Sequence, residues 1–317
     1  MHALRRRSVS CKWSWALSLR NFYQSNAFPY EMRKVLSMSI VFLNGAYVRA
    51  EDARISPFDR GFTFGEGVYE VCIAVNGKFV DAPAHFARLD RSLAACGIAP
   101  PPERADLDSI MQELLRKNDV TTGLIYLQVT SGVSPRNFTI RPEGRSTLLM
   151  LAQASDFEQT SAFREGIHVQ LREDIRWLHR DIKTTMLMPQ VMAKRDALAH
   201  GVSDTLFYDE QGITEGASSN VFLVDAYGTL VTRPLSNRLL AGCTRERILD
   251  LARGAGFSIE KRPIQRAELA TATECFVTSA TYLIAPVLTI DGVSIADGQV
   301  GPITRTLQRL YCNYMND

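Results

Sequence analysis

Two Asn-Gly dipeptides, each set between runs of apolar and β-branched residues, place the strongest constraint on how this chain can fold. Asn44-Gly45 separates residues 40–43 from residues 46–48, and Asn76-Gly77 follows the strand-like run of residues 68–74. Both members of such a pair tolerate the positive φ that two-residue hairpin turns require. The sequence therefore predicts two antiparallel hairpins near the start of the patterned chain.

Helices and further strands follow these hairpins in the same half of the chain. Apolar residues recur at helical spacing over residues 83–97 and 104–117, and strand-like runs occupy residues 126–130 and 147–151. We therefore expect residues 38–155 to form a small α/β domain.

Beyond a polar stretch at residues 155–160, which suits a linker, the chain has more strand-like runs than helical ones. One expected helix begins near Pro189 and stops at Gly201, and another has Thr244 at its N-cap. The other predicted elements are strands at residues 167–171, 205–209, 221–225, 229–233, 274–279 and 287–295 and a terminal helix at residues 303–314. The predicted fold class is α+β (mixed α/β), with a larger β-rich domain at residues 160–317.

Residues 1–37 form a basic extension with seven arginines and lysines and a single glutamate, although the whole chain has a formal net charge of +2. The composition resembles a mitochondrial transit peptide, but a disordered tail or a mis-assigned start is the preferred interpretation, because strand patterning begins at Met38. The remaining residues carry a net negative charge, which gives no support for a nucleic-acid partner. No run of eighteen apolar residues occurs, so no membrane-spanning helix is expected.

The six cysteines and five histidines are dispersed, with no C-x-x-C pair and no cluster at metal-ligand spacing. We therefore expect no metal site. Reduced, buried thiols are the usual state of cysteines in the cytoplasm, which is the location expected for this chain.

Lys183 lies where a strand pattern gives way to a helical one. A lysine taken alone is most often a solvated surface charge. Here Ile182 precedes it and Met186, Leu187 and Met188 follow it, and apolar surroundings favour the neutral, nucleophilic amine. Lys183 is therefore a candidate for covalent catalysis.

Three places are candidates for binding an anionic group. Gly242-Cys243-Thr244 opens a predicted helix whose first amides are free to donate, Thr278-Ser279 ends an apolar strand, and Arg88 supplies a cation. The first of these is equally compatible with an ordinary loop and helix cap. Glu215 is either a solvated turn residue or a carboxylate that keeps a pyridine nitrogen protonated.

Several short stretches occur together and in a fixed order: DRGFTFGEGVYE at 59–70, HFARL at 85–89, SPR at 134–136, EDIRW at 173–177, DIK at 181–183, TEG at 214–216, LLAGCTR at 239–245 and FVTS at 276–279. In this combination the chain resembles the class IV (fold type IV) pyridoxal-phosphate aminotransferases from about Ile40 to its last predicted helix. Within that family it is most similar to the D-amino-acid aminotransferases.

The resemblance implies pyridoxal 5′-phosphate as cofactor and a two-domain fold whose site lies between the domains of each subunit of a homodimer. Lys183 would form the Schiff base and then carry the proton of the substrate α-carbon, and Glu215 would bind the pyridine nitrogen. Tyr69 and Arg136 would hold the substrate carboxylate. The phosphate would lie on Arg88, the Cys243 backbone, Thr244 and Ser279, with Leu240 against the ring.

Two positions depart from the family pattern. Asn137-Phe138 stands where the D-amino-acid enzymes have a histidine two residues after the substrate arginine, so we expect altered selectivity. Ala280 replaces a threonine that helps to hold the phosphate, so we expect poorer cofactor retention.

The predicted reaction is ping-pong transfer of the amino group of a D-amino acid, such as D-alanine, to a 2-oxo acid, such as 2-oxoglutarate. A branched-chain L-amino-acid aminotransferase is the main competing interpretation. The stretches at 134–136 and 176–177 argue against it, whereas Phe138 keeps it open by making the pocket more apolar. An aminodeoxychorismate lyase and a structural relative without cofactor are two further interpretations.

Overall fold

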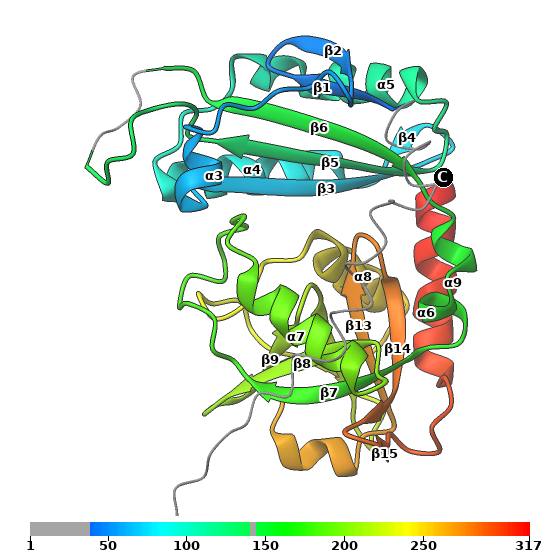
Figure 1. Ribbon diagram of the computed structural model, residues 1–317. Helices are drawn as coiled ribbons and strands as arrows, with labels where there is room; N and C mark the ends of the chain where they lie inside the picture. The colour runs from blue at the N-terminus through cyan, green and yellow to red at the C-terminus, as the bar shows by residue number, and fades with distance from the viewer. Residues whose placement is uncertain (1–38, 140–143) are drawn as a thin grey trace, which may run out of the picture.

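The computed structural model describes residues 39–139 and 144–317, which form two β-sheets with helices packed on and between them (Figure 1). The predicted basic extension, residues 1–37, lies outside the described residues. The α+β fold class predicted from the sequence is confirmed. The division into domains at 38–155 and 160–317 stays a prediction.

The first sheet has six strands in the order β2-β1-β6-β5-β3-β4. They are β1 (Ile40–Leu43), β2 (Ala46–Arg49), β3 (Gly67–Val75), β4 (Lys78–Phe79), β5 (Gly123–Thr130) and β6 (Thr147–Ala154). Both predicted hairpins are confirmed, since β1 pairs with β2 and β3 with β4 in antiparallel register. Asn44 and Asn76 adopt φ of 50° and 52° at the two turns, as the Asn-Gly pairs require.

Helices α4 (Ala82–Cys96) and α5 (Leu107–Lys117) pack on one face of this sheet. Leu89 and Met111 from the helices and Val68 from β3 belong to the same buried cluster. Each such apolar side chain stabilises the fold by about 1.5–3 kcal/mol when it leaves water. This core therefore anchors β3, which carries site residues.

The second sheet has nine strands in the order β12-β11-β10-β13-β14-β7-β8-β9, with β15 paired to β14. They are β7 (Ile167–Glu173), β8 (Asp204–Asp209), β9 (Gly212–Gly216), β10 (Asn220–Val224), β11 (Leu230–Thr232), β12 (Ile259–Lys261), β13 (Glu274–Ser279), β14 (Leu283–Ile290) and β15 (Val293–Ser294). The associated helices are α6 (Ser161–Arg164), α7 (Met188–Ala199), α8 (Cys243–Gly254) and α9 (Pro302–Asn316).

A shared apolar cluster joins the two sheets. Ile73 and Val75, on the face of β3 opposite to α4, pack in one cluster with Phe222 of β10 and with Leu307 and Tyr311 of α9. Helix α9 runs along the second sheet, and its C-terminal end reaches the first (Figure 1). The two sheets are thus held in a fixed relation on either side of the site.

Three local predictions need correction. Residues 155–160 are not a bare linker, because the short helix η2 (Phe157–Gln159) places Phe157 in the shared cluster. Thr244 is not the N-cap of its helix, because α8 begins at Cys243 with Gly242 as N-cap. The strand β9 was not predicted, because all five of its residues are buried and no alternating pattern marks it.

No helix among residues 39–139 and 144–317 is both long enough and apolar enough to span a membrane.

Candidate active site

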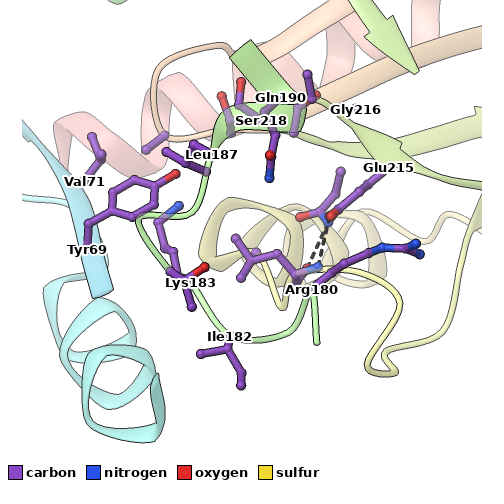
Figure 2. Close-up of a pocket in the computed structure, with 18 of the residues that line it drawn as sticks. Tyr69, Val71, Arg180, Ile182, Lys183, Leu187, Gln190, Glu215, Gly216 and Ser218 are labelled. Carbon is purple, nitrogen blue, oxygen red and sulfur yellow. Dashed lines mark hydrogen bonds between the residues drawn. The ribbon is translucent and has the colours of Figure 1, made fainter. Parts of the chain in front are cut away.

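A cavity of about 270 Å³ lies between the two sheets. It is lined by most of the residues predicted from the sequence to form a site: Tyr69, Arg88, Lys183, Glu215, Leu240, Cys243, Thr244 and Ser279. Figure 2 shows Lys183 and Tyr69 on one side of this pocket and Glu215 on the other. Residues separated by more than two hundred positions in the sequence therefore converge on one space.

Lys183 lies in the irregular segment between β7 and α7, and that segment is fixed to the first sheet. The Tyr69 amide donates to the Lys183 carbonyl at 3.0 Å, and the Thr185 amide donates to the Gly67 carbonyl at 2.9 Å. The Lys183 Nζ lies 4.1 Å from the centroid of the Tyr69 ring. The position of the amine therefore depends on both halves of the molecule.

The apolar setting expected from the neighbours of Lys183 in sequence is present in part: Ile182, Met186 and Leu187 line the cavity with the lysine, and Met188 does not. Met186 and Met188 are 44% and 66% exposed. The aromatic face of Tyr69 is the apolar surface that the amine contacts, and it comes from β3.

Glu215 is a strand residue and is buried, so the interpretation as a solvated turn residue is wrong. Its Oε1 lies 2.7 Å from Nη1 of Arg176, and its Oε2 accepts from the Leu240 amide at 2.9 Å and from Asn220 Nδ2 at 3.1 Å. Burial raises the pKa of Glu215, and the neighbouring Arg176 partly opposes that rise. The carboxylate is thus held in one orientation by three donors.

A glycine permits this arrangement. A Cβ at Gly242 would lie 2.0 Å from Oδ1 of Asn220, so any side chain there would push away the amide that orients Glu215. The same glycine is the N-cap of α8, and no side chain caps that helix. The first amides of α8 are therefore available to an anion at the cavity wall.

Two buried hydroxyl groups beside the α8 N-terminus have no hydrogen-bond partner among the described residues. They are Oγ of Ser219 and Oγ1 of Thr278, and both residues line the cavity. Buried hydroxyls are normally paired, so unpaired ones on residues that line a cavity are available to a ligand. Together with the free amides, they fit a phosphate group.

Arg88 completes this end of the cavity and is held from behind by Glu70. Nε and Nη2 of Arg88 each lie 2.8 Å from a Glu70 oxygen, and Nη1 donates to the Ala241 carbonyl at 2.8 Å. Burial alone would raise the pKa of Glu70, but Arg88 and His85 lower it to about 2. The His85 ring lies 2.8 Å from Glu70. Burial lowers the pKa of His85, but its neighbours Cys72, Cys243 and Glu70 together raise it well above the ordinary value.

Arg136, predicted to bind the substrate carboxylate, does not line the cavity of its own chain. It lies on an exposed loop, with its guanidinium carbon 5.2 Å and 5.9 Å from the ring centroids of Phe64 and Phe138. Phe138 itself is 79% exposed. The structure therefore brings Tyr69 to the site but leaves Arg136 outside it.

Sequence reasoning missed several groups that hold the site together. Arg176, Asp174 and Glu70 fell inside the family-like stretches but received no role. Ser219 and Asn220 lie a few residues after Glu215 and received none either. For Glu70 and Asn220 the signal was a charged or amide residue within an otherwise buried strand, whereas Asp174, Arg176 and Ser219 lie outside the strands. Such residues require a buried partner, which the sequence alone does not name.

Comparison with known proteins agrees with this geometry. The model of the family "Amino-transferase class IV" matches residues 67–290. D-alanine aminotransferase of Staphylococcus haemolyticus is 34% identical over 279 residues, covering 88% of this chain and 98% of that protein. D-alanine aminotransferase of Listeria monocytogenes is 35% identical over 273 residues, covering 86% and 94%.

Among solved structures, the branched-chain aminotransferase of Thermoproteus uzoniensis superimposes with a TM-score of 0.79 at 25% identity, covering 87% of this chain and 94% of that one. The fold, the family model and the relatives agree. The chain belongs to the class IV aminotransferases.

Proposed function

We propose that this class IV aminotransferase uses pyridoxal 5′-phosphate to move the amino group of a D-amino acid, such as D-alanine, to a 2-oxo acid, such as 2-oxoglutarate. The observation that carries the proposal is that Lys183, Glu215 and the open α8 N-terminus line one cavity. These are an amine, a carboxylate and an anion site, which are the three groups that such a cofactor needs.

Each end of the cofactor has its residues. The α8 amides, Thr278, Ser219 and Arg88 would hold the phosphate, and the Ser279 hydroxyl already accepts from the Tyr282 amide at 3.0 Å. Leu240 lines the cavity beside the Glu215 carboxylate, to which its amide donates. The cofactor, when bound, supplies the conjugated ring that accepts electrons from the substrate α-carbon.

Lys183 would act as nucleophile and then as acid and base. The backbone at Lys183 and Thr185 is fixed to β3, whereas the long lysine side chain can move Nζ within the cavity. The amine can therefore carry a proton from one atom to another. Tyr69 forms the wall beside the amine and would restrict where the substrate lies. Glu215 would hold a proton on the ring nitrogen from the opposite end of the cavity.

The D-amino-acid substrate is supported by the two D-alanine aminotransferases, which match nearly the whole described chain. The structural likeness to a branched-chain enzyme supports the fold rather than the substrate.

We further propose a homodimer in which a second copy covers the open side of the cavity. Apolar side chains around Lys183 and on the neighbouring loops are exposed to an extent unusual for a lone chain: Phe58 58%, Phe62 80%, Phe138 79%, Ile175 71% and Met188 66%. Because Arg136 lies outside the cavity of its own chain, its substrate role requires such a second copy.

Purified protein given D-alanine and 2-oxoglutarate should form pyruvate, and borohydride reduction should fix the cofactor to Lys183, as mapped by mass spectrometry. Bound cofactor should give a visible absorption band that disappears on borohydride reduction. A Lys183→Ala variant that kept this band would refute the assignment of the lysine. Faster turnover of L-leucine than of D-alanine would refute the D-specific proposal, and pyruvate from aminodeoxychorismate alone would establish the lyase instead.

The dimer has its own test. Sedimentation should give twice the chain mass, and a mixture of inactive Lys183→Ala and Arg136→Ala proteins should regain activity, because mixed dimers contain one site with both residues. A dimer without regained activity would mean that Arg136 serves its own chain or no site.

A further inference from the structure

We propose that Arg176 is a positioning residue that keeps Glu215 ionised and thereby leaves the shared proton on the ring nitrogen of the cofactor. This inference rests on the proposed function, because it concerns how the same carboxylate works. It adds a role for a buried network that the reaction itself does not touch.

The network fixes the guanidinium of Arg176 between two carboxylates. Nη1 lies 2.7 Å from Oε1 of Glu215, while Nη2 and Nε lie 2.7 Å and 2.9 Å from the two oxygens of Asp174. The Arg176 and Asp174 side chains are buried, and the guanidinium carbon lies 4.6 Å from the centroid of the Phe207 ring. Arg176 therefore cannot swing away to leave Glu215 unpaired.

The buried charges around Glu215 cancel only when Glu215 is ionised. Arg176 contacts it directly, Asp174 contacts Arg176, and Arg180 joins through Asp174, with Nη1 3.2 Å from Oδ2. The other neighbours of the carboxylate are uncharged, namely the Asn220 amide and the Leu240 backbone. Two guanidinium groups and two carboxylates sum to zero, so a protonated Glu215 would leave one guanidinium uncompensated in a buried site, which is costly.

This balance decides where a shared proton lies. A ring nitrogen opposite Glu215 and the carboxylate compete for one proton: if it moves, the N–H bond breaks and an O–H bond forms on Glu215. Burial raises the pKa of Glu215 and so favours that movement, whereas the charge of Arg176 opposes it. Removal of Arg176 leaves Arg180 and Asp174 balanced by themselves, and Glu215 then becomes neutral by taking the proton.

The test places a label on the atom in question. Wild type and the variants Arg176→Met, Arg176→Gln and Arg176→Lys are loaded with pyridoxal phosphate carrying ¹⁵N in the ring, and the ¹⁵N resonance is recorded at neutral pH. In the Met and Gln variants the ratio of protonated to unprotonated ring nitrogen should fall at least about tenfold, the equivalent of one pKa unit. Arg176→Lys keeps the charge and should retain the protonated signal.

Two controls separate charge from structure. Arg172→Met removes a guanidinium from the end of β7, where Arg172 pairs with Asp196 at a partly exposed position, and it should leave the resonance unchanged. Asp174→Asn breaks the same buried network but removes a negative charge, so it should also keep the ring nitrogen protonated. If Arg176→Met does not fold, Arg176→Gln, which retains an amide donor, decides the question against Arg176→Lys.

The outcomes distinguish the inference from the function on which it rests. Failure of wild type to bind the labelled cofactor would overturn the proposed function. A cofactor bound with an unprotonated ring nitrogen in wild type would overturn the role of Glu215. A protonated ring nitrogen in Arg176→Gln, or its loss in Asp174→Asn, would overturn the inference while leaving the function in place.

Discussion

The two ends of the cavity use the same kind of buried pair, an arginine with a glutamate, but one end presents the arginine alone and the other presents both members. At the α8 end Arg88 lines the cavity and its partner Glu70 does not. At the β9 end both members of the pair, Glu215 and Arg176, line the cavity, and Arg176 is held in turn by Asp174. One pair therefore suits an anion and the other a protonated nitrogen.

The charge balance behind the two pairs differs as well. Around Arg88 the single carboxylate of Glu70 contacts both Arg88 and His85. Around Glu215 two arginines face two carboxylates. The first end thus shares one carboxylate between an arginine and a histidine, whereas the second sums to zero over two arginines and two carboxylates. Substitution of one charged residue at each end should show how each charge balance affects turnover, stability and cofactor affinity.

The largest effect is expected at the carboxylate that faces the cavity. Glu215→Gln keeps the shape but cannot hold a proton on a ring nitrogen, so kcat/KM for D-alanine should fall by about 10²–10⁴-fold, the range of general acid and base effects. Cofactor should still bind through the phosphate end. The matched control is Glu210→Gln, at a largely exposed site. Unchanged turnover in Glu215→Gln would mean that the β9 end does not act on the cofactor.

Among these substitutions, the loss of Glu70, the partner of Arg88, should lower the free energy of unfolding most. Glu70→Gln leaves Arg88 and His85 uncompensated, so the free energy of unfolding at pH 7 should fall by about 3–5 kcal/mol. Since the pKa of Glu70 is lowered to about 2 from 4.5, this contribution is present above pH 4.5 and is lost as the pH falls toward 2.

Urea unfolding of the cofactor-free protein at several pH values checks this prediction. The difference between wild type and Glu70→Gln should shrink steadily below pH 4.5. A difference that stays constant with pH would show that Glu70 acts through packing rather than through its charge.

Cofactor affinity should respond to the geometry of Arg88 as well as to its charge. A lysine cannot contact Glu70 through two nitrogens, reach the Ala241 carbonyl and still face the cavity. Arg88→Lys should therefore weaken pyridoxal-phosphate binding by about 10–100-fold, the loss of one charge-assisted hydrogen bond. Arg91→Lys, on an exposed position of the same helix, is the control in equilibrium dialysis. Equal affinities would mean that Arg88 does not contact the phosphate.

The sequence predicted the parts of the site that follow from local pattern. The hairpins depended on Asn-Gly turns, and Lys183 and Glu215 were found within short stretches whose chemistry is recognisable. The supporting contacts were not predicted, because Arg176, in the segment after β7, meets Glu215 of β9 only in the folded chain, and Glu70 of β3 likewise meets Arg88 of α4. A charged residue in a buried strand shows that a partner exists, but its identity depends on tertiary packing. Arg136 shows a further limit, since its role requires a second chain.

The smallest expected effect concerns the hydroxyl of Thr278, which has no hydrogen-bond partner among the described residues. It is compared with the hydroxyl of Thr232, which has one. Thr232 is equally buried, but its Oγ1 donates to the Val221 carbonyl at 2.8 Å. Thr232→Val should therefore lower the stability of the cofactor-free protein by about 1 kcal/mol, whereas Thr278→Val loses no bond and should leave it unchanged or higher.

The order should reverse when binding is measured. Thr278→Val removes a donor to the phosphate and should weaken cofactor binding by up to about tenfold, a net hydrogen bond of about 1 kcal/mol, while Thr232→Val should not change it. Thermal melting without cofactor and fluorescence titration with it give the two quantities for both variants. If Thr278→Val destabilised the cofactor-free protein as much as Thr232→Val does, the Thr278 hydroxyl would be satisfied without a ligand, as that of Thr232 is.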